Sequence, residues 1–480
     1  MEKKWHFKTE EVTHKESEAY MKHKSVYLLV ATAFLAVCVM TGCAGSGSTD
    51  AGVTEETAKD AAAANAIFSA DNETEGGDSS DSSATGEGEA EPEGKEVEME
   101  TWKTAIEGLA EDFIFGMDVS SLLVEEKSGV KYYDFDGNEQ DALKTFADSG
   151  INYIRLRVWN DPYDENGNGY GGGNNDLPTA IELGKRATGY GMKVLVDFHY
   201  SDFWADPQKQ IVPKAWKGMS LSEKSSALYD YTKDSLGQLF DAGVDVGMVQ
   251  IGNEINNGMS GETKIENVIE LLKAGSKAVR EISSERGKDI GIVVHYTDIS
   301  PKEGVLALIE KLVNGGLDFD MMGLSYYPFW HGDMDNMKNV IKYIGEHFGK
   351  KAFIAETSYC YTLEDGDGFG NRVSKSDLVE GYPATIEGQA SYMHDLYQNV
   401  NSAGGLGVFY WEGAWLPVGP ANADNSLIWE KYGSGWASSF ASDYDKDAAK
   451  YYGGSSWDNQ AFFDFGGHPL ESIKVFKYMK

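Results

Sequence analysis

From about residue 101 onward, short runs rich in β-branched and aromatic residues alternate with longer stretches of helical periodicity. The helical stretches include "EQDALKTFADSG" and "ALYDYTKDSLGQLFDAG", and both end in Gly, a residue common just past the ends of helices. Eight such units predict an α/β fold, a (β/α)8 TIM barrel over residues 101–480. The alternative is an open doubly wound sheet, but no GxGxxG motif follows the first expected strand. The expected strands are "FIFGMDVS", "YIRLRVW", "KVLVDFHY", "VGMVQIGNE", "GIVVHYTD", "MMGLSYYP", "KAFIAETS" and "GLGVFYWE".

Polar and aromatic side chains stand at the ends of these expected strands, where a barrel of this kind carries its active site. A single acidic residue at such a place is more often an ordinary loop carboxylate than a catalyst. Core packing explains Val249 and Ile251 in the fourth strand, but it does not explain Glu254 at its end. The residues at the strand ends are Asp118, Arg157 with Trp159, His199 with Asp202, Asn253 with Glu254, Tyr326 with Tyr327, Glu356, and Trp411 with Glu412.

Two of these residues, Glu254 and Glu356, end the fourth and seventh expected strands and therefore face each other across the barrel mouth. Such a pair suits glycoside hydrolysis, in which one carboxyl group donates a proton and the other, ionised, attacks the sugar. Arg157 is expected to keep a carboxylate ionised through its charge. Arg155, on the same strand face, is expected to be a structural residue of the barrel.

Several other residues suit contacts with a sugar. Asn253 can hydrogen-bond a sugar hydroxyl, and tryptophan rings offer flat apolar faces to pyranose rings. The alternative for these tryptophans, which include Trp415, is ordinary core packing, and we expect about half of them to be core. The predicted substrate-binding residues are Asp118, Arg157, Trp159, His199, Asp202, Trp204, Asn253, Tyr326, Trp330 and Trp411.

The loop after the seventh expected strand, "YTLEDGDGFGN", places Asp365, Asp367 and Asn371 in a D-x-D-x-x-x-N spacing. Hard cations such as Ca²⁺ prefer several oxygen ligands from a flexible loop. Phe369, between these residues, can offer only its backbone carbonyl. The spacing alone favours a cation site and an acidic Gly-rich turn equally.

The N-terminal region has the features of an export signal. Residues 21–42 combine a basic start with a short apolar run, and "MTGC" then resembles a bacterial lipoprotein signal with Cys43 as the lipidated residue. The alternative is a plain signal peptide with an incidental Cys. Residues 1–20 precede this complete signal, so we interpret them as a spurious extension.

Residues 43–100 are expected to be a disordered linker, because apolar residues are sparse and residues 44–100 contain 16 acidic and 2 basic residues. The formal net charge of the whole chain, -35, argues against nucleic acid as a partner and is compatible with a neutral ligand. Together, the lipoprotein signal and this linker predict a lipid-anchored protein at the cell surface that contacts the membrane only through the lipid.

The motifs "GMDVS", "IRLRVWNDP", "DFHYSDFWADP", "VQIGNEINNG", "LSYYPFW", "IAETSY" and "FYWEGAW" resemble the endo-β-1,4-galactanases of glycoside hydrolase family 53, in clan A. The resemblance extends from about residue 105 to the end of the chain. It implies a retaining mechanism with Glu254 as acid/base and Glu356 as nucleophile. It also implies a polysaccharide substrate, the β-1,4-galactan of type I arabinogalactan in pectin, and we expect a monomer.

The same resemblance implies a structural Ca²⁺ and no catalytic metal. Bacterial members of the family bind calcium in the corresponding loop, with further ligands from a C-terminal Ser-x-x-Asp. This chain departs from its relatives at Phe369, where a relative has His, but a carbonyl ligand survives that change. The implied ligands are Asp365, Asp367, the Phe369 carbonyl, Asn371, Ser455 and Asp458.

Two other functions remain open from the sequence. One is a non-catalytic glycan-binding surface lipoprotein, although a binder does not need both Glu254 and Glu356. The other is a clan A β-glycanase that acts on mannan or glucan.

Overall fold

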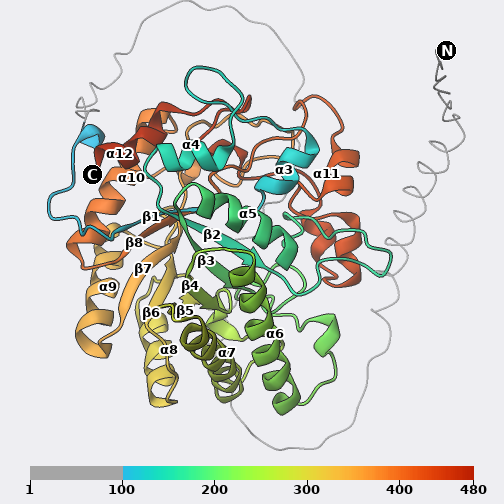
Figure 1. The fold of residues 1–480 in the computed structure, drawn as a ribbon. Coiled ribbons are helices and arrows are strands. Elements are labelled where there is room, and N and C mark those ends of the chain that lie inside the picture. Colours follow the sequence, from blue (N-terminus) through green and yellow to red (C-terminus); the bar gives the residue numbers. More distant parts are fainter. Residues whose placement is uncertain (1–100) are drawn as a thin grey trace, which may run out of the picture. The chain divides into compact units, whose positions relative to one another are not determined.

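A computed structural model describes residues 101–480. The predictions for residues 1–20, 21–42 and 43–100, including lipidation of Cys43, lie outside the described residues. Eight parallel strands form a closed barrel in sequence order (Figure 1). The (β/α)8 barrel is therefore confirmed and the open sheet is excluded. The strands are β1 (Ile114–Asp118), β2 (Tyr153–Val158), β3 (Lys193–Phe198), β4 (Val246–Ile251), β5 (Gly291–Tyr296), β6 (Met321–Ser325), β7 (Lys351–Glu356) and β8 (Gly407–Tyr410).

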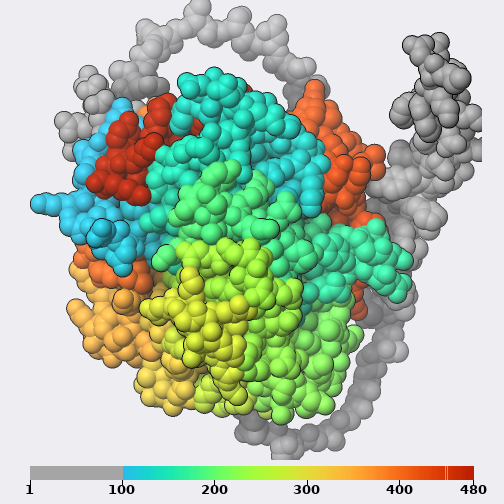
Figure 2. Space-filling model, in the orientation of Figure 1, coloured from blue at the N-terminus to red at the C-terminus, as the bar shows by residue number. Residues whose placement is uncertain are grey.

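Helices follow every strand and surround the barrel, and their side chains form a continuous surface in the space-filling view (Figure 2). Among the described residues, no helix combines the length and the apolar character needed to cross a bilayer. The α-helices are α3 (Leu122–Ser128), α4 (Ala142–Asp148), α5 (Leu177–Gly189), α6 (Leu221–Asp241), α7 (Ile265–Arg286), α8 (Glu303–Asn314), α9 (Met334–Phe348), α10 (Ile386–Ser402), α11 (Ser426–Tyr432) and α12 (Val475–Tyr478). The short 3-10 helices are η2 (Thr101–Lys103), η3 (Lys214–Trp216), η4 (Ile255–Asn257), η5 (Lys375–Asp377), η6 (Ser439–Asp443), η7 (Ala448–Tyr451), η8 (Asp458–Gln460) and η9 (Glu471–Lys474).

Local sequence signals mark the ends of several helices. At the start of α6, Ser220 and Glu223 form a capping box, which satisfies backbone N–H groups that the helix itself cannot satisfy. The glycines predicted to end helices are also found where expected. Gly150 and Gly243 lie just past α4 and α6, with left-handed φ values of 100° and 86°. Each of these glycines lies three residues before the next strand begins.

The lower barrel interior is filled by one apolar side chain from most strands, including Leu195, Phe353 and Phe409. Phe409 lies against Gly116 of β1, where a Cβ atom would stand 2.3 Å from the Phe409 Cδ1 atom. The ring therefore occupies the space that the missing side chain leaves. Toward the carboxyl ends of the strands the barrel interior is polar, with Asp118, Arg155 and Asp197 buried there. The candidate active site lies at this end.

Segments from the two ends of the described chain lie side by side, because the Ile106 N–H donates to the Met479 carbonyl at 3.0 Å. The long segment after β8 contains α11 and several 3-10 helices, shown in orange to red in Figure 1. It contributes Trp436, which stacks on Trp204 at the barrel mouth, and Trp457, which stacks on Trp436.

The contact between Gly116 and Phe409 gives a test of the barrel interior. Gly116→Ala should lower the free energy of unfolding by about 1–3 kcal/mol, the usual cost of overpacking a core. Gly189→Ala is the matched control, because nothing lies within 4 Å of a Cβ at that helical position. The control should be neutral or slightly stabilising. Thermal unfolding measures both, and equal melting temperatures for Gly116→Ala and the parent protein would contradict this packing.

Candidate active site

Glu254 and Glu356 both lie at the carboxyl end of the barrel. Glu356 is the last residue of β7, and Glu254 follows β4 by three residues. Glu356 is 8% exposed and Glu254 is half-buried. The structure therefore places both predicted carboxyl groups at the barrel mouth.

The backbone of Glu254 has a left-handed conformation, with φ 44° and ψ 55°. This conformation costs a non-glycine residue roughly 1–3 kcal/mol and persists where its surroundings hold it. The Gln210 side-chain amide donates to the Asn253 carbonyl at 2.8 Å, and η4 begins at Ile255, directly after Glu254. In this geometry the Glu254 Oε1 atom lies 2.7 Å from the Ser325 hydroxyl oxygen at the end of β6.

Glu356 is held by two donors. Arg155 Nη1 lies 2.7 Å from its Oε1 atom, and the Tyr327 hydroxyl donates to its Oε2 atom at 3.1 Å. Arg155 is fully buried and also contacts Asp118 at 3.0 Å and Asp197 at 2.9 Å. The residue that we expected to be structural thus contacts the candidate nucleophile directly.

The two carboxyl groups have different electrostatic environments. Burial, followed by the negative charge of Glu356, raises the pKa of Glu254 to about 8. Burial also raises the pKa of Glu356, but the charge of Arg155 and the Tyr327 hydrogen bond oppose that shift. Because the Arg155 cation contacts Glu356, Glu356 should be the first of the two carboxyl groups to ionise. The site can therefore hold one ionised and one protonated carboxyl group near neutral pH.

Arg157 contacts a different carboxylate from Arg155. Its Nη1 atom forms an ion pair with Glu412, which follows β8, and lies 3.4 Å from Asp118. Its guanidinium also lies over the Trp204 ring, 4.6 Å from the centroid. The expectation that Arg157 contacts a carboxylate agrees with this geometry, but that carboxylate is neither Glu254 nor Glu356.

Five of the predicted substrate-binding side chains are at most 1% exposed. Trp159 is fully buried and donates to His199 Nδ1 at 3.1 Å, and the other ring nitrogen of His199, Nε2, contacts Asp197. A fully buried ring offers no face for a sugar, so the stacking role expected for Trp159 does not fit this structure. The five are Asp118, Trp159, His199, Asp202 and Tyr326, and the predicted residues Arg157, Asn253 and Trp411 are also buried.

Aromatic residues form a wall beside the carboxyl groups. Trp204 stacks on Trp436 with ring centroids 4.7 Å apart, and Trp436 stacks on Trp457 at 5.7 Å. Trp411 meets Trp457 edge to face at 4.8 Å. Trp204 and Trp436 remain partly exposed, as does Trp330, which lies 5.4 Å from Tyr327. Sequence reasoning missed Trp436 and Trp457, although a tryptophan in a Gly/Ser-rich loop was an available signal.

Three of the six predicted calcium ligands lie close together. Asp365, Asp367 and Asp458 each bring a carboxylate oxygen within 4.8 Å of the other two. Among the described residues, Asp458 Oδ1 and Asn371 Oδ1 are buried without a hydrogen-bond partner. Buried oxygens of this kind are normally satisfied, and carboxylate and amide oxygens are suitable ligands for Ca²⁺. The donor set therefore fits a hard cation.

Other contacts in this loop also fit the alternative of a simple acidic turn. Asp365 accepts hydrogen bonds from the backbone of Gly368 and Gly370, as an Asp in a turn often does. Asp367 accepts from the backbone N–H of Ser455 at 2.7 Å, so the loop and the C-terminal segment are joined without a cation as well.

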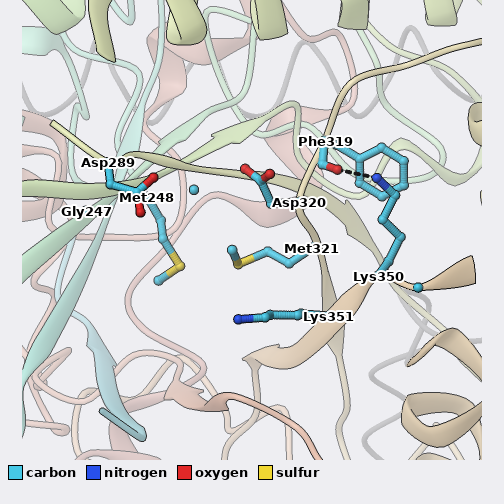
Figure 3. Close-up of a pocket in the computed structure, with 10 residues that line it drawn as sticks. Gly247, Met248, Asp289, Phe319, Asp320, Met321, Lys350 and Lys351 are labelled. Carbon is cyan, nitrogen blue, oxygen red and sulfur yellow. Dashed lines mark hydrogen bonds between the residues drawn. The ribbon is translucent and has the colours of Figure 1, made fainter. Parts of the chain in front are cut away.

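The opposite end of the barrel contains a cavity of about 450 Å³ (Figure 3). Its walls include the first residues of β4 to β7, with Met248, Met321 and Lys351 among the labelled side chains. Because parallel strands run away from this end, the cavity is remote from Glu254 and Glu356. It takes no part in the candidate chemistry.

The chain resembles characterised proteins along most of the described region. It is 52% identical over 378 residues to "Endo-beta-1,4-galactanase" of Bacillus subtilis (strain 168), covering 78% of this chain and 87% of that protein. It is 34% identical over 362 residues to "Arabinogalactan endo-beta-1,4-galactanase" of Cellvibrio japonicus (strain Ueda107), covering 73% and 86%.

A solved structure of a related protein also resembles this chain along most of the described region. The family 53 catalytic domain of Ignisphaera aggregans matches with a TM-score of 0.70 and 39% identity, covering 78% of this chain and 98% of that one. The sequence model described as "Glycosyl hydrolase family 53" matches residues 114–476, which include both glutamates and the surrounding network. The chain therefore belongs to glycosyl hydrolase family 53.

Proposed function

We propose that this protein is a retaining endo-β-1,4-galactanase that hydrolyses the β-1,4-galactan of type I arabinogalactan. The names of the Bacillus and Cellvibrio relatives support this substrate. The observation that carries the chemistry is the unequal setting of the two glutamates. Glu356 faces the Arg155 cation, whereas Glu254 faces the neutral Ser325 hydroxyl.

In the first step, the Glu356 carboxylate attacks the anomeric carbon while the bond to the leaving oxygen breaks. Glu254 gives its proton to that oxygen, so the departing sugar leaves as an alcohol. In the second step, Glu254 takes a proton from water, and the resulting hydroxide attacks the anomeric carbon and releases Glu356. Two inversions at one carbon retain its configuration.

The surroundings of Glu356 support this role. Tyr327 and Arg155 hold both of its oxygens, which fixes the carboxylate in one orientation before substrate binds. The partly exposed rings of Trp204, Trp330 and Trp436 offer apolar faces for galactose units. We therefore assign sugar binding to this aromatic wall.

Incubation with galactan, mannan and cellulose tests the function. New reducing ends should appear from galactan and not from the other two polymers. Glu356→Ala should lower the rate by roughly 10⁴- to 10⁶-fold, as losses of catalytic nucleophiles do. Glu346→Ala, an exposed glutamate on α9, is the matched control and should keep full activity.

The outcome of this experiment also separates the alternatives. A binding protein would release no reducing ends, and a mannan or glucan enzyme would prefer another polymer. NMR of the first product should show the β-anomer, and initial formation of the α-anomer would exclude the double displacement.

The pKa of Glu254 predicts the alkaline side of the pH profile. Glu254 must be protonated to act as an acid, so kcat/KM should fall as pH rises through about 8. Glu254→Ala should lose this alkaline limb on an aryl galactoside with a good leaving group, because such a substrate needs no acid. An unchanged alkaline limb in this variant would assign the limb to another group.

We further propose that Asp365, Asp367, Asn371 and Asp458 hold a structural Ca²⁺, together with Ser455 and the Phe369 carbonyl. The unpartnered oxygens of Asp458 and Asn371 support this proposal. When bound, the ion would join the loop after β7 to the segment after β8. No step of the reaction involves it.

Chelation should therefore lower the melting temperature, and added Ca²⁺ should restore it, because a ligand that binds only the folded state stabilises that state. Asp458→Asn should weaken or remove this response. Asp136→Asn is the control, since it alters a similar acidic turn at "YDFDGN" that lies outside the cluster. A parent protein whose melting is indifferent to chelator and Ca²⁺ would leave the acidic turn as the correct interpretation.

We also propose that the protein is exported and anchored by lipid on Cys43, with residues 43–100 as a spacer. The basic start, apolar run and "MTGC" of residues 21–43 support this proposal. The acyl chains of a lipoprotein would hold the enzyme firmly at the membrane.

Cys43→Ala should release active enzyme into the medium, as measured by galactanase activity in the cell-free supernatant. Cys360→Ala is the matched control, because Cys360 is buried in the folded domain and should not affect anchoring. Retention of the Cys43 variant at the membrane would contradict the lipid anchor.

A further inference from the structure

A chain of short polar contacts leads away from Glu254 into the barrel. The Ser325 hydroxyl oxygen lies 2.7 Å from Glu254 Oε1 and 2.9 Å from His295 Nε2. On the other side of the ring, His295 Nδ1 lies 2.8 Å from Asn253 Oδ1. His295 and Ser325 are fully buried and belong to β5 and β6. Neither side chain takes part in a bond-making step of the proposed reaction.

The orientation of the Asn253 amide fixes one end of this chain. Its Nδ2 atom donates to the Ala205 carbonyl at 2.8 Å, and Arg155 Nη2 donates to its Oδ1 atom at 3.0 Å. Oδ1 is therefore an acceptor, and at 2.8 Å it matches the His295 tautomer that carries its hydrogen on Nδ1. A neutral imidazole carries one N–H, which leaves Nε2 as an acceptor.

These constraints determine what Ser325 does. If His295 Nε2 is an acceptor, the Ser325 hydroxyl donates its only hydrogen to it. The Ser325 oxygen can then only accept from Glu254, so Glu254 carries a proton on this side. The chain of contacts thus matches Glu254 in its acid form.

The ionised form of Glu254 requires the opposite arrangement. A carboxylate only accepts, so the Ser325 hydroxyl must turn and donate to it. His295 then donates from Nε2 to Ser325, and its Nδ1 atom accepts from Gln250 Nε2 at 3.1 Å and from the Glu254 backbone N–H at 3.4 Å, while Asn253 Oδ1 keeps Arg155 Nη2 as its donor. The imidazole carries one proton in both arrangements, but on different nitrogens.

We propose that Ser325 and His295 form a hydrogen-bond relay that reverses direction with each ionisation of Glu254. The relay rests on the proposed role of Glu254 as acid/base. It gives this residue a matched partner in both halves of the reaction without placing a new charge in the barrel. Ser325 and His295 are positioning residues, because they act through Glu254.

The surrounding charges keep the relay neutral. Burial and the cation of Arg155 lower the pKa of His295 well below its usual range, although Asp197 opposes the shift and His199 adds to it. The groups that face Glu254 are Glu356 from β7, Asp206 from the loop after β3, Thr297 after β5 and Ser325 from β6. Since His295 stays uncharged, Glu254 is the member of the relay that titrates.

The tautomer of His295 tests the relay without measuring activity. In protein labelled with ¹⁵N at histidine, long-range proton–nitrogen spectra distinguish Nδ1–H from Nε2–H. His295 should be Nδ1–H at low pH and shift toward Nε2–H as Glu254 ionises. Glu254→Gln, which carries an amide donor at every pH, should keep His295 as Nδ1–H throughout.

Two serine variants complete the test. Ser325→Ala should make the His295 tautomer independent of Glu254 and should raise the alkaline limb of kcat/KM by about 0.5 to 1 pH unit, because a donor to the ionised form is lost. Ser276→Ala, whose hydroxyl bonds the Asp318 carbonyl on the barrel exterior, should change neither result. A single His295 tautomer across the titration, or an unchanged switch in Ser325→Ala, would overturn the relay.

Failure of the proposed function has a different signature. Azide should restore activity of Glu254→Ala on an aryl galactoside only if Glu254 is the acid/base. If azide fails while the His295 tautomer still follows Glu254, the relay stands and the catalytic role does not. If azide succeeds while the tautomer is fixed, the reverse holds.

Discussion

The buried guanidinium of Arg155 is the charge around which the candidate active site is arranged. Burying a cation inside a barrel is costly unless carboxylates surround it with good geometry. Asp118, Asp197 and Glu356 meet this requirement from β1, β3 and β7, so one side chain ties three strands together. The same contact that compensates the buried cation also fixes the proposed nucleophile.

The charges of this network do not cancel. Arg155 and Arg157 face four carboxyl groups, those of Asp118, Asp197, Glu356 and Glu412. Burial and the remaining negative charge together raise the pKa of Glu412 to about 7 and also raise that of Glu356. The network therefore takes up a proton readily near neutral pH, while a carboxylate held beside Arg155 suits a reaction whose transition state is an oxocarbenium cation.

This arrangement also separates the roles of the two glutamates. Glu356 belongs to the charged network on the Arg155 side, whereas Glu254 belongs to a neutral chain through Ser325 and His295. Asn253 joins the two parts, because Arg155 donates to the amide oxygen that His295 also contacts. The orientation of this amide therefore links the charge on the nucleophile side to the proton on the acid/base side.

The sequence predicted the barrel and the positions of Glu254 and Glu356, because strand–helix alternation and the strand-end rule depend on local pattern alone. It did not distinguish Arg155 from Arg157. Both point to the same face of β2, and only the register of the closed barrel decides which one reaches Glu356.

The same limit applies to residues whose role depends on three-dimensional neighbours. Trp159 stands at a strand end yet is buried, whereas Trp436 comes from a loop far along the chain and reaches the barrel mouth. His295 and Ser325 lie inside expected strands, where nothing in the sequence separates them from ordinary core positions. Their importance follows from contacts between β4, β5 and β6.

Covalent trapping of the nucleophile tests the central claim most directly. A 2-deoxy-2-fluoro-β-galactoside with a good leaving group should react once, because the fluorine destabilises the cationic transition state and slows release of the glycosyl-enzyme. Mass spectrometry of the digested protein should find one added sugar, on the peptide that contains Glu356. A label on another residue, or steady hydrolysis of the reagent without any covalent intermediate, would contradict the account.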